Sequence, residues 1–182
     1  MGSSVVQRWR AFRWADAALA GLSFAVSLGA YLATLSPGLS YASPDGNELI
    51  TVCATLGLAH PTGYPLYTWL GKAFTLLPIG SVAYRVNLMS AVLGAGAVAL
   101  LYAIVRLVAR ARAVALAAAL FFAFSRTFWS QATIAEVYAP NLFWVALTIL
   151  FFLLWAEREA VSYTHLRAHE TPEHLVCRLL LE

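Results

Sequence analysis

Charged residues are scarce in this sequence, and cysteine is nearly absent. Only 12% of the 182 residues are Asp, Glu, Lys or Arg, whereas 61% are hydrophobic. No core of this length hides so much apolar surface from water, so the composition excludes a soluble single-domain enzyme and an intrinsically disordered chain. The two cysteines, Cys53 and Cys177, give neither a disulfide framework nor a metal-ligand spacing, and we interpret Cys53 as a small apolar residue. We therefore expect lipid to be the main solvent of the chain.

The C-terminal segment, residues 160–182, differs in character from the rest. It holds three of the four histidines, which are His165, His169 and His174. When back-translated, most of it resembles both parts of an adapter used in transposon-based sequencing libraries. We therefore predict that this segment is derived from an adapter, that its histidines form no metal site, and that residues 1–159 are the native part. The alternative is a genuine cytoplasmic linker.

Four apolar runs predict an all-α fold of about four membrane-spanning helices. They cover residues 17–35, about 86–105, about 113–128 and about 140–156. The last two are shorter and are bracketed by aromatic residues typical of membrane interfaces, Trp129, Trp144 and Trp155. In the second run, Ser90, Gly94 and Gly96 predict close packing against another helix.

Basic residues are distributed unequally between the two sides of these runs. One side carries Arg8, Arg10, Arg13, Arg106, Arg110, Arg112 and Arg158, and the other carries Lys72, Arg85 and Arg126. The positive-inside rule places the first group in the cytoplasm. We expect an integral membrane protein, of a bacterial inner membrane, with a cytoplasmic N-terminus and two outward segments at residues 36–85 and 126–138. Short basic clusters beside apolar runs also argue against a nucleic-acid partner.

The first outward segment contains two short apolar stretches, residues 47–59 and 65–77. Both have helical spacing and are too short to span a membrane, and a string rich in Pro and Gly separates them. We predict two short helices that lie on the outer membrane surface or re-enter it. Connections as long as this segment usually carry function.

Two carboxylates, Asp45 and Glu48, stand where the first of these short helices begins. Their spacing lets both face an outward cleft, where either is able to accept a proton from an acceptor hydroxyl. The same pattern is typical of a capping box, in which Asp45 accepts from helix amides and Glu48 reaches back. Both interpretations stay open, and they are compatible with each other.

The second outward segment supplies a third acid, Glu136, with Tyr138 beside it. An acid near the membrane is a candidate for function, and we take both residues as candidates for substrate binding. A pair between Glu136 and Arg126 is the structural alternative.

Further candidates for substrate binding are His60 and Tyr64, in the turn between the two short helices, and the outward cations Arg85 and Arg126. The turn is able to aim His60 at a phosphate or an acceptor, although a single histidine is more often structural. Arginine suits a lipid-linked phosphate because its guanidinium donates two parallel hydrogen bonds. For both arginines, ordinary interfacial placement is the alternative.

Four strings occur in an order that resembles a known family. They are Asp45-Gly46-Asn47-Glu48-Leu49, Ala54 to Tyr67 with its His60-Pro61-Thr62-Gly63-Tyr64-Pro65 core, Phe128-Trp129-Ser130-Gln131-Ala132, and Ala135-Glu136-Val137-Tyr138. The chain resembles the N-terminal part of the domain of unknown function 2723 family, over residues 17–157. Animal relatives of that family are protein O-mannosyltransferases, and the family is similar to the GT-C glycosyltransferases.

This resemblance implies that a sugar is transferred from a polyprenyl-phosphate donor to the hydroxyl of an acceptor protein or glycan, on the outer membrane face. It implies a catalytic base at Asp45 or Glu48, no certain cofactor, and leaves a divalent metal open. Members of the family have further spans, so residues 1–159 are expected to be a truncated N-terminal part, inactive alone. The alternative is a non-catalytic transporter or assembly protein, against which the lack of charges inside the predicted spans argues.

Overall fold

The computed structural model describes residues 14–41, 43, 45–61 and 63–168, the last twelve of these as backbone only. Within this part of the chain all regular elements are helices, which confirms the predicted fold class. In chain order they are α2 (Trp14–Ala33), α3 (Gly46–Thr55), α4 (Pro65–Thr75), α5 (Val82–Ala109), α6 (Arg112–Ala123), α7 (Arg126–Ala132) and α8 (Tyr138–Ala168). The N-terminal arginines predicted to be cytoplasmic, and Cys177, His169 and His174, lie outside the described residues.

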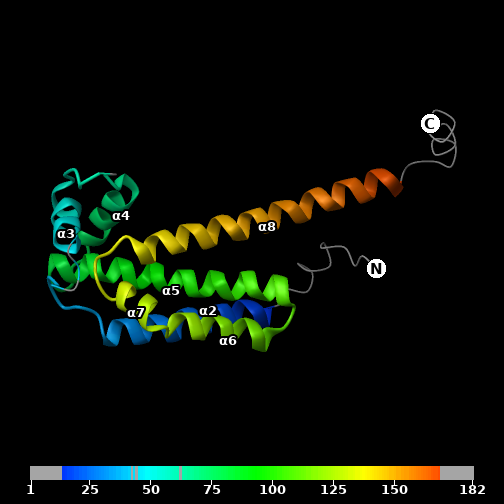
Figure 1. Ribbon diagram of the computed structural model, residues 1–182, viewed down its shortest axis with the longest axis horizontal. Helices are drawn as coiled ribbons and strands as arrows, with labels where there is room; N and C mark the ends of the chain where they lie inside the picture. Colours follow the sequence, from blue (N-terminus) through cyan, green and yellow to red (C-terminus); the bar gives the residue numbers. More distant parts are fainter. Residues whose placement is uncertain (1–13, 42, 44, 62, 169–182) are drawn as a thin grey trace.

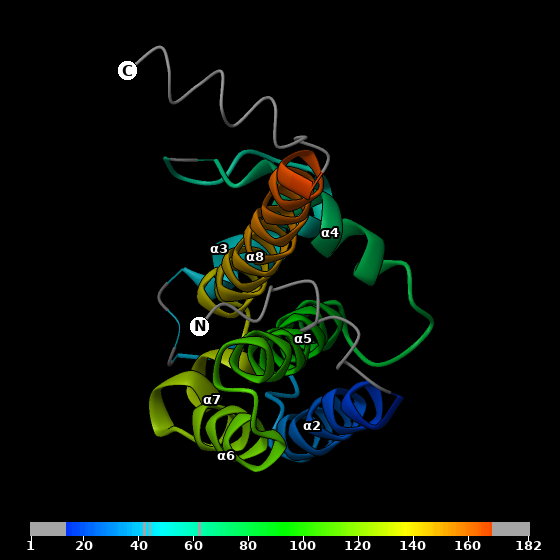
Figure 2. The same cartoon turned by 90° about the vertical axis from the view of Figure 1, so that its right-hand side faces the viewer.

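Three helices are long and apolar enough to cross a membrane, namely α2, α5 and residues 138–156 of α8. The pair α6 and α7 makes a fourth crossing if the two are counted as one broken span. This number of apolar helices indicates an integral membrane protein. Helix α5 is central: it packs against α2 and α6 on one side and against the first half of α8 on the other (Figures 1 and 2).

The third apolar run, predicted as one helix over residues 113–128, is divided in the structure. Helix α6 ends at Ala123, and the chain bends by 65° before α7 begins at Arg126. Between them Ser125 has an extended backbone, and its hydroxyl donates to the Phe122 carbonyl at 2.8 Å. A serine that bonds a nearby carbonyl competes with the helix ladder, so an apolar run can contain a bend that hydropathy does not reveal.

The two short helices predicted in the first outward segment are present as α3 and α4. Helix α3 ends at Thr55, earlier than predicted, because Leu56 adopts a left-handed conformation with φ of 56°. The backbone amides of Leu56 and Gly57 then both donate to the Val52 carbonyl, which satisfies the helix end.

Small residues of α5 allow close packing, as predicted. A Cβ added at Gly94 would lie 3.1 Å from the Cβ of Ala132 in α7, and one at Gly96 would lie 2.9 Å from the Phe143 ring in α8. Ser90 is fully buried on the same helix. These positions bring α5 near the backbones of α7 and α8.

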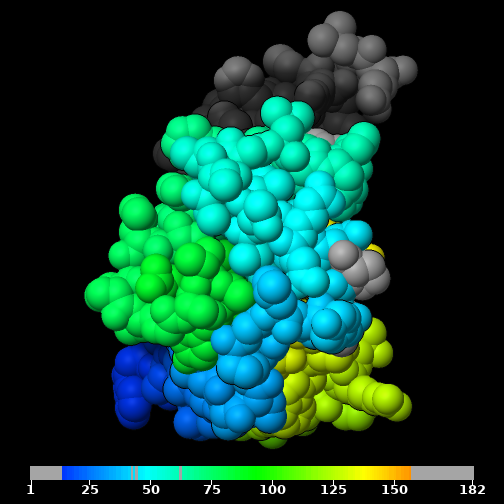
Figure 3. Space-filling model, turned by 90° about the vertical axis from the view of Figure 1, so that its left-hand side faces the viewer, coloured from blue at the N-terminus to red at the C-terminus, as the bar shows by residue number. Residues whose placement is uncertain are grey.

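The two segments predicted to face outward meet at one end of the helix bundle. The Ser36 amide donates to the Thr133 carbonyl at 3.0 Å, and the Asn87 side chain donates to the Ser36 carbonyl at 2.8 Å. Helices α3 and α4 lie at this end (Figure 1), and Figure 3 shows the light-blue chain that precedes α3 beside the yellow-green segment around residues 125–138. At the opposite end, Asp16 of α2 forms ion pairs with Arg106 of α5 and with Arg112 of α6.

One close contact within this end is testable by a single substitution. A Cβ added at Gly71 of α4 would collide with both side-chain atoms of Cys53 in α3. We expect Gly71→Ala to destabilise the α3–α4 contact by about 1–3 kcal/mol, because overpacking a filled core costs this much. Thermal unfolding in detergent should show a lower midpoint, and Cys53→Ala should partly restore it. Gly29→Ala is the control, because nothing lies within 4 Å of a Cβ there. An unchanged midpoint for Gly71→Ala would contradict the contact.

Candidate functional site

A serine, and not the predicted capping box, holds the N-terminus of α3. The Gly46 amide donates to Ser43 Oγ at 2.6 Å, and Ser43 is 2% exposed. Asp45 occupies the N-cap position but makes no side-chain capping bond. Glu48 bonds elsewhere, so the capping interpretation of both carboxylates is wrong. Within the described part of the chain, the exposed Asp45 carboxylate has neither a hydrogen bond nor an ion pair.

Glu48 binds His60 through both of its carboxylate oxygens. Glu48 Oε2 lies 2.9 Å from His60 Nδ1, and Oε1 accepts from the His60 backbone amide at 2.8 Å. Both side chains are partly exposed, 43% for Glu48 and 34% for His60. The pair ties the start of α3 to the turn that precedes α4, so the sequence string between them is closed into a compact loop.

These contacts change the protonation equilibria of both residues. The hydrogen bonds from His60 lower the pKa of Glu48 below its usual value. The hydrogen bond to Glu48 raises the pKa of His60 above its usual value of 6.5, and the negative charges of Asp45 and Glu136 act in the same direction. Glu48 is thus the hydrogen-bonded partner of His60, whereas Asp45 and Glu136 act on it only through their charge.

The shifted pKa values predict a pH window for this pair. Glu48, whose pKa is lowered, supports the pair above its ordinary value of 4.5 and stops doing so as the pH falls through the lowered pKa. His60, whose pKa is raised, supports it fully below 6.5 and stops as the pH rises through the raised pKa. We expect Glu48→Gln to move the pKa of His60 back toward 6.5. The pH dependence of diethylpyrocarbonate modification at His60, read by mass spectrometry, measures this shift, with Thr127→Ala as control. An unchanged profile in Glu48→Gln would show that the pair does not form.

Glu136 is buried, and it bonds to Ser43, in the first of the two segments predicted to face outward. It is 5% exposed, and its Oε1 lies 2.5 Å from Ser43 Oγ. The alternative pairing of Glu136 with Arg126 is therefore wrong, because no ion pair joins them among the described residues. Instead, the Ser43–Glu136 bond joins the two segments predicted to face outward.

The two candidate arginines have different positions. Arg85 closes the turn between α4 and α5: its Nε donates to the Ile79 carbonyl, Nη1 to that of Thr75 and Nη2 to that of Gly80, at 2.6, 2.7 and 3.0 Å. Its guanidinium is thus used within the protein. Arg126 is exposed at the start of α7, and no described contact brings it to His60.

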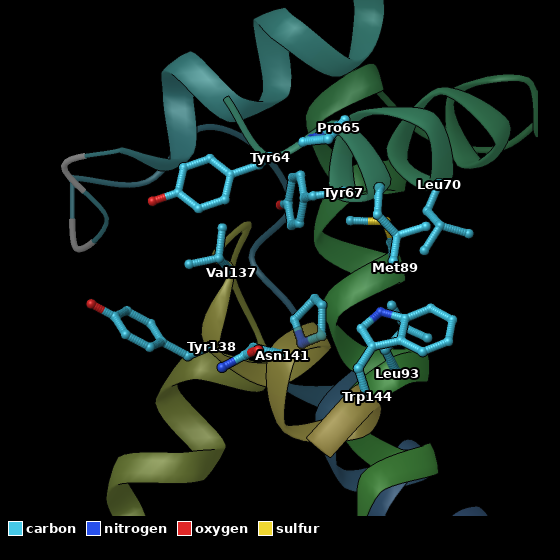
Figure 4. A pocket seen from close by; sticks show the side chains of 12 residues that line it. Tyr64, Pro65, Tyr67, Leu70, Met89, Leu93, Val137, Tyr138, Asn141 and Trp144 are labelled. Carbon is cyan, nitrogen blue, oxygen red and sulfur yellow. The ribbon is translucent and has the colours of Figure 1, made fainter. Parts of the chain in front are cut away.

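A cavity of about 470 Å³ lies between α4, α5 and the start of α8 (Figure 4). It is mostly apolar, and its lining is formed by Tyr64, Pro65, Leu66, Tyr67, Leu70, Met89, Leu93, Val137, Tyr138, Pro140, Asn141 and Trp144. Two sequence candidates, Tyr64 and Tyr138, therefore line one cavity, and Figure 4 shows both rings on the same side of it. Tyr138 is 59% exposed.

Tyr64 connects this cavity to the acidic residues. Its ring contacts the His60 ring edge to face, with centroids 5.4 Å apart, and it also lines the cavity. Tyr64 has a positive φ of 42°, which is unusual for a bulky residue and is held here by the start of α4. With this backbone conformation, the Tyr64 ring lies between His60 and the cavity.

Two residues of this site, Ser43 and Tyr67, are not among the candidates predicted from the sequence. Tyr67 is 6% exposed and lines the cavity, and its hydroxyl has no hydrogen-bond partner among the described residues. Ser43 precedes a helix start by a few positions, which is a usual place for a capping hydroxyl, so that signal was present. Nothing in the sequence pattern distinguished Tyr67 from the other aromatic residues.

No set of three or more His, Cys, Asp and Glu side chains in the described part of the chain is able to hold a metal ion.

Comparison with known proteins places the chain beside one family model and a mouse relative. The family model described as protein O-mannosyl-transferase TMEM260 N-terminal domain matches residues 45–171. The mouse protein O-mannosyl-transferase TMEM260 is 39% identical over 100 residues, which are 54% of this chain and 14% of the mouse protein. The chain thus covers well under a fifth of that relative. No solved structure gives a significant match. The matched range extends past Glu159, and the origin of residues 160–182 stays a prediction.

Proposed function

Because the chain belongs to the family of the protein O-mannosyl-transferase TMEM260 N-terminal domain, we propose that the full-length protein is a membrane glycosyltransferase. Membership confirms the resemblance to the domain of unknown function 2723 family. The proposed reaction moves a sugar from a polyprenyl-phosphate donor to a hydroxyl of an acceptor protein or glycan, on the outer membrane face. Mannose is the first sugar to test, because the mouse relative is named an O-mannosyl-transferase.

The observation that carries this proposal is the position of Tyr64 between His60 and the apolar cavity. A polyprenyl phosphate is apolar along its chain and charged at its head. The cavity offers apolar walls to the chain, and His60 offers a hydrogen-bond donor to the phosphate at the place where the cavity ends. One ligand with both parts fits this arrangement better than a wholly polar or wholly apolar ligand does.

Asp45 is the carboxylate best suited to be the base. Both oxygens of Glu48 are occupied by His60, and its lowered pKa makes it a weak proton acceptor. Asp45 is exposed, three residues earlier at the start of the same helix, with its oxygens unoccupied by described residues. Glu48 then orients His60, and Asp45 takes the proton.

In the proposed step the acceptor oxygen forms a bond to the anomeric carbon of the donor sugar. The bond from that carbon to the phosphate oxygen breaks, and its electron pair leaves with the polyprenyl phosphate. The acceptor proton moves to Asp45. Attack opposite to the leaving group inverts the anomeric carbon, so an inverted product linkage is expected.

The leaving phosphate needs a positive group or hydrogen-bond donors near it. His60 fits this role, because its Nδ1 faces Glu48 and its Nε2 remains for the phosphate. The raised pKa of His60 favours the protonated ring, which carries a donor on both nitrogens. Arg126 is the further candidate, whereas Arg85 is engaged by three carbonyls.

The test is transfer of labelled mannose from polyprenyl-phosphate mannose to membrane protein by the purified full-length protein in nanodiscs. We expect transfer with the lipid donor and none with nucleotide-linked mannose. Transfer from the nucleotide donor alone, or from neither donor while the protein is folded, would reject the proposed function.

Filling the cavity tests the donor assignment. Leu93→Trp places a bulky ring in the cavity wall in place of an aliphatic side chain. We expect the KM for the lipid donor to rise about tenfold, because the loss of apolar contacts in a pocket costs roughly 1–3 kcal/mol of binding. The matched control is Leu22→Trp, on α2 at a residue that is 50% exposed and distant from the cavity lining. If both variants bind the donor like the wild type, the chain of the donor does not occupy the cavity.

A further inference from the structure

We propose that Glu136 is a positioning residue for Asp45 and that it acts through Ser43. This inference rests on the proposed function, since it assigns Asp45 as the base. It takes a residue of the second outward segment, first considered a candidate for direct substrate contact, and gives it a different role.

A continuous set of hydrogen bonds links Glu136, Ser43 and Gly46. Glu136 Oε1 lies 2.5 Å from Ser43 Oγ, and Ser43 Oγ accepts from the Gly46 amide at 2.6 Å. A hydroxyl has one proton and two acceptor sites, so Ser43 is able to donate to Glu136 while it accepts from Gly46. Asp45 lies between Ser43 and Gly46 in the chain. Ser43, two residues before the proposed base, and Gly46, directly after it, are therefore linked to one carboxylate.

The backbone at Gly46 also approaches the backbone at Ala135 closely. A Cβ added at Gly46 would lie 2.6 Å from the Ala135 carbonyl oxygen and would also collide with the Ser43 side chain. Only glycine permits this distance. The start of α3 thus packs directly on the backbone of the residue that precedes Glu136, and the Ala135 carbonyl there also lies 3.3 Å from Ser43 Oγ.

Burial excludes Glu136 from a direct role. Glu136 is 5% exposed and Ser43 is 2% exposed, so the carboxylate does not face an acceptor at the surface. A short hydrogen bond to an ionised acceptor is stronger than one between neutral groups, which suits a carboxylate to hold a loop in one place. The charge also lies close enough to His60 to favour its protonated form.

Loss of the hydrogen bonds that link Glu136 to Ser43 and Gly46 should affect kcat, whereas loss of a substrate contact would affect KM. Small displacements of a proton acceptor affect the chemical step, whereas donor binding depends on His60 and the cavity. We therefore expect Glu136→Ala to lower kcat on the order of 10- to 100-fold, because misplacing a reacting group by about 1 Å costs this much. The KM for the lipid donor should stay within about twofold of the wild type. Glu136→Gln keeps an oxygen that accepts from Ser43, and it should recover most of the lost kcat.

The experiment combines kinetics with an observable that does not need activity. The full-length protein in nanodiscs is prepared as wild type, Glu136→Ala, Glu136→Gln and Ser43→Ala, with Thr127→Ala as the control from the same outward segment. Donor kinetics use polyprenyl-phosphate mannose. Hydrogen–deuterium exchange follows the peptide that covers residues 43–49, where loss of the link should speed exchange in Glu136→Ala and Ser43→Ala but not in Thr127→Ala.

The outcomes separate the two proposals. Loss of kcat in Glu136→Ala and Ser43→Ala, recovery in Glu136→Gln and faster exchange support the positioning role. Unchanged kcat or unchanged exchange in Glu136→Ala overturns it, as does a change confined to donor KM. Equal inactivity of Glu136→Gln and Glu136→Ala with an active Ser43→Ala also overturns it, since the charge itself would then be needed. A wild type that transfers no sugar rejects the proposed function, and the exchange of residues 43–49 still decides whether the link exists.

Discussion

Replacement of Asp45 by Asn is expected to lower the kcat of sugar transfer at least about 100-fold, because a positioned general base contributes on the order of 10²- to 10⁴-fold. Asparagine has nearly the same shape and cannot accept the acceptor proton. Since the Asp45 side chain makes no capping bond, the substitution removes no hydrogen bond from the helix start. Expression and the thermal midpoint should therefore stay at the wild-type values. The measurement is single-turnover transfer with saturating lipid donor.

Glu48→Gln is the matched comparison for Asp45→Asn. Both substitutions remove one negative charge near the start of α3, so a purely electrostatic effect would make them equal. Glu48 acts on His60, to which both its oxygens bind, so its loss should raise donor KM and should lower kcat less than Asp45→Asn does. Full activity in Asp45→Asn, or a larger kcat loss in Glu48→Gln, would reverse the assignment of the base.

The helical framework was predictable from the sequence because it depends on local patterns. An apolar run of about 20 residues predicts a membrane helix without any knowledge of its neighbours, and α2, α5 and the first part of α8 follow this rule. Helical spacing and the breaker string at residues 60–65 were sufficient for α3 and α4. The bend at Ser125 was not predictable, since the apolar run continues through it.

The partners of the site residues were not predictable, because they are tertiary contacts. In a capping box, Glu48 would bond one nearby backbone amide. His60, 12 residues away in the sequence, instead offers it two nitrogens, the backbone amide and Nδ1. The Ser43–Glu136 bond joins residues 93 positions apart, and no spacing rule connects them. The sequence therefore identified Glu48, His60 and Glu136 as candidates but assigned partners to the acids from their near neighbours.

The same limit applies to the opposite end of the bundle, where sequence analysis considered the arginines only as determinants of orientation. Arg106 Nε lies 2.7 Å and Arg112 Nε 2.9 Å from Asp16 Oδ1, while Arg112 Nη2 lies 3.1 Å from Oδ2. The Tyr102 hydroxyl donates to the same carboxylate at 3.3 Å. Asp16 is fully buried, and it connects α2 to α5 and α6. This residue lies just before the predicted start of the first span, where no local pattern indicates a structural role.

Asp16→Ala is expected to be strongly destabilising, by about 3 kcal/mol, because breaking a buried ion pair leaves the partner charge without compensation. Arg106, whose side chain is 13% exposed, would be left buried and unpaired, whereas Arg112 is 41% exposed and is solvated more easily. Arg112→Gln should accordingly cost less than Asp16→Ala, and Asp16→Asn should fall between them, since an amide still accepts one hydrogen bond.

The buried thiol of Cys53 provides the measurement, because burial raises its pKa to about 12 and keeps it unreactive until α3 and α4 separate. In a Cys177→Ser background, a thiol-reactive dye should report a midpoint for Asp16→Ala that is about 5–10 °C below the wild type. A double substitution, Asp16→Ala with Arg106→Leu, removes the stranded charge and should recover part of this loss. If Asp16→Ala unfolds at the wild-type temperature, the cluster adds nothing to stability. If instead the double variant is no better than the single one, the loss comes from packing around Asp16 and not from the unpaired charge of Arg106.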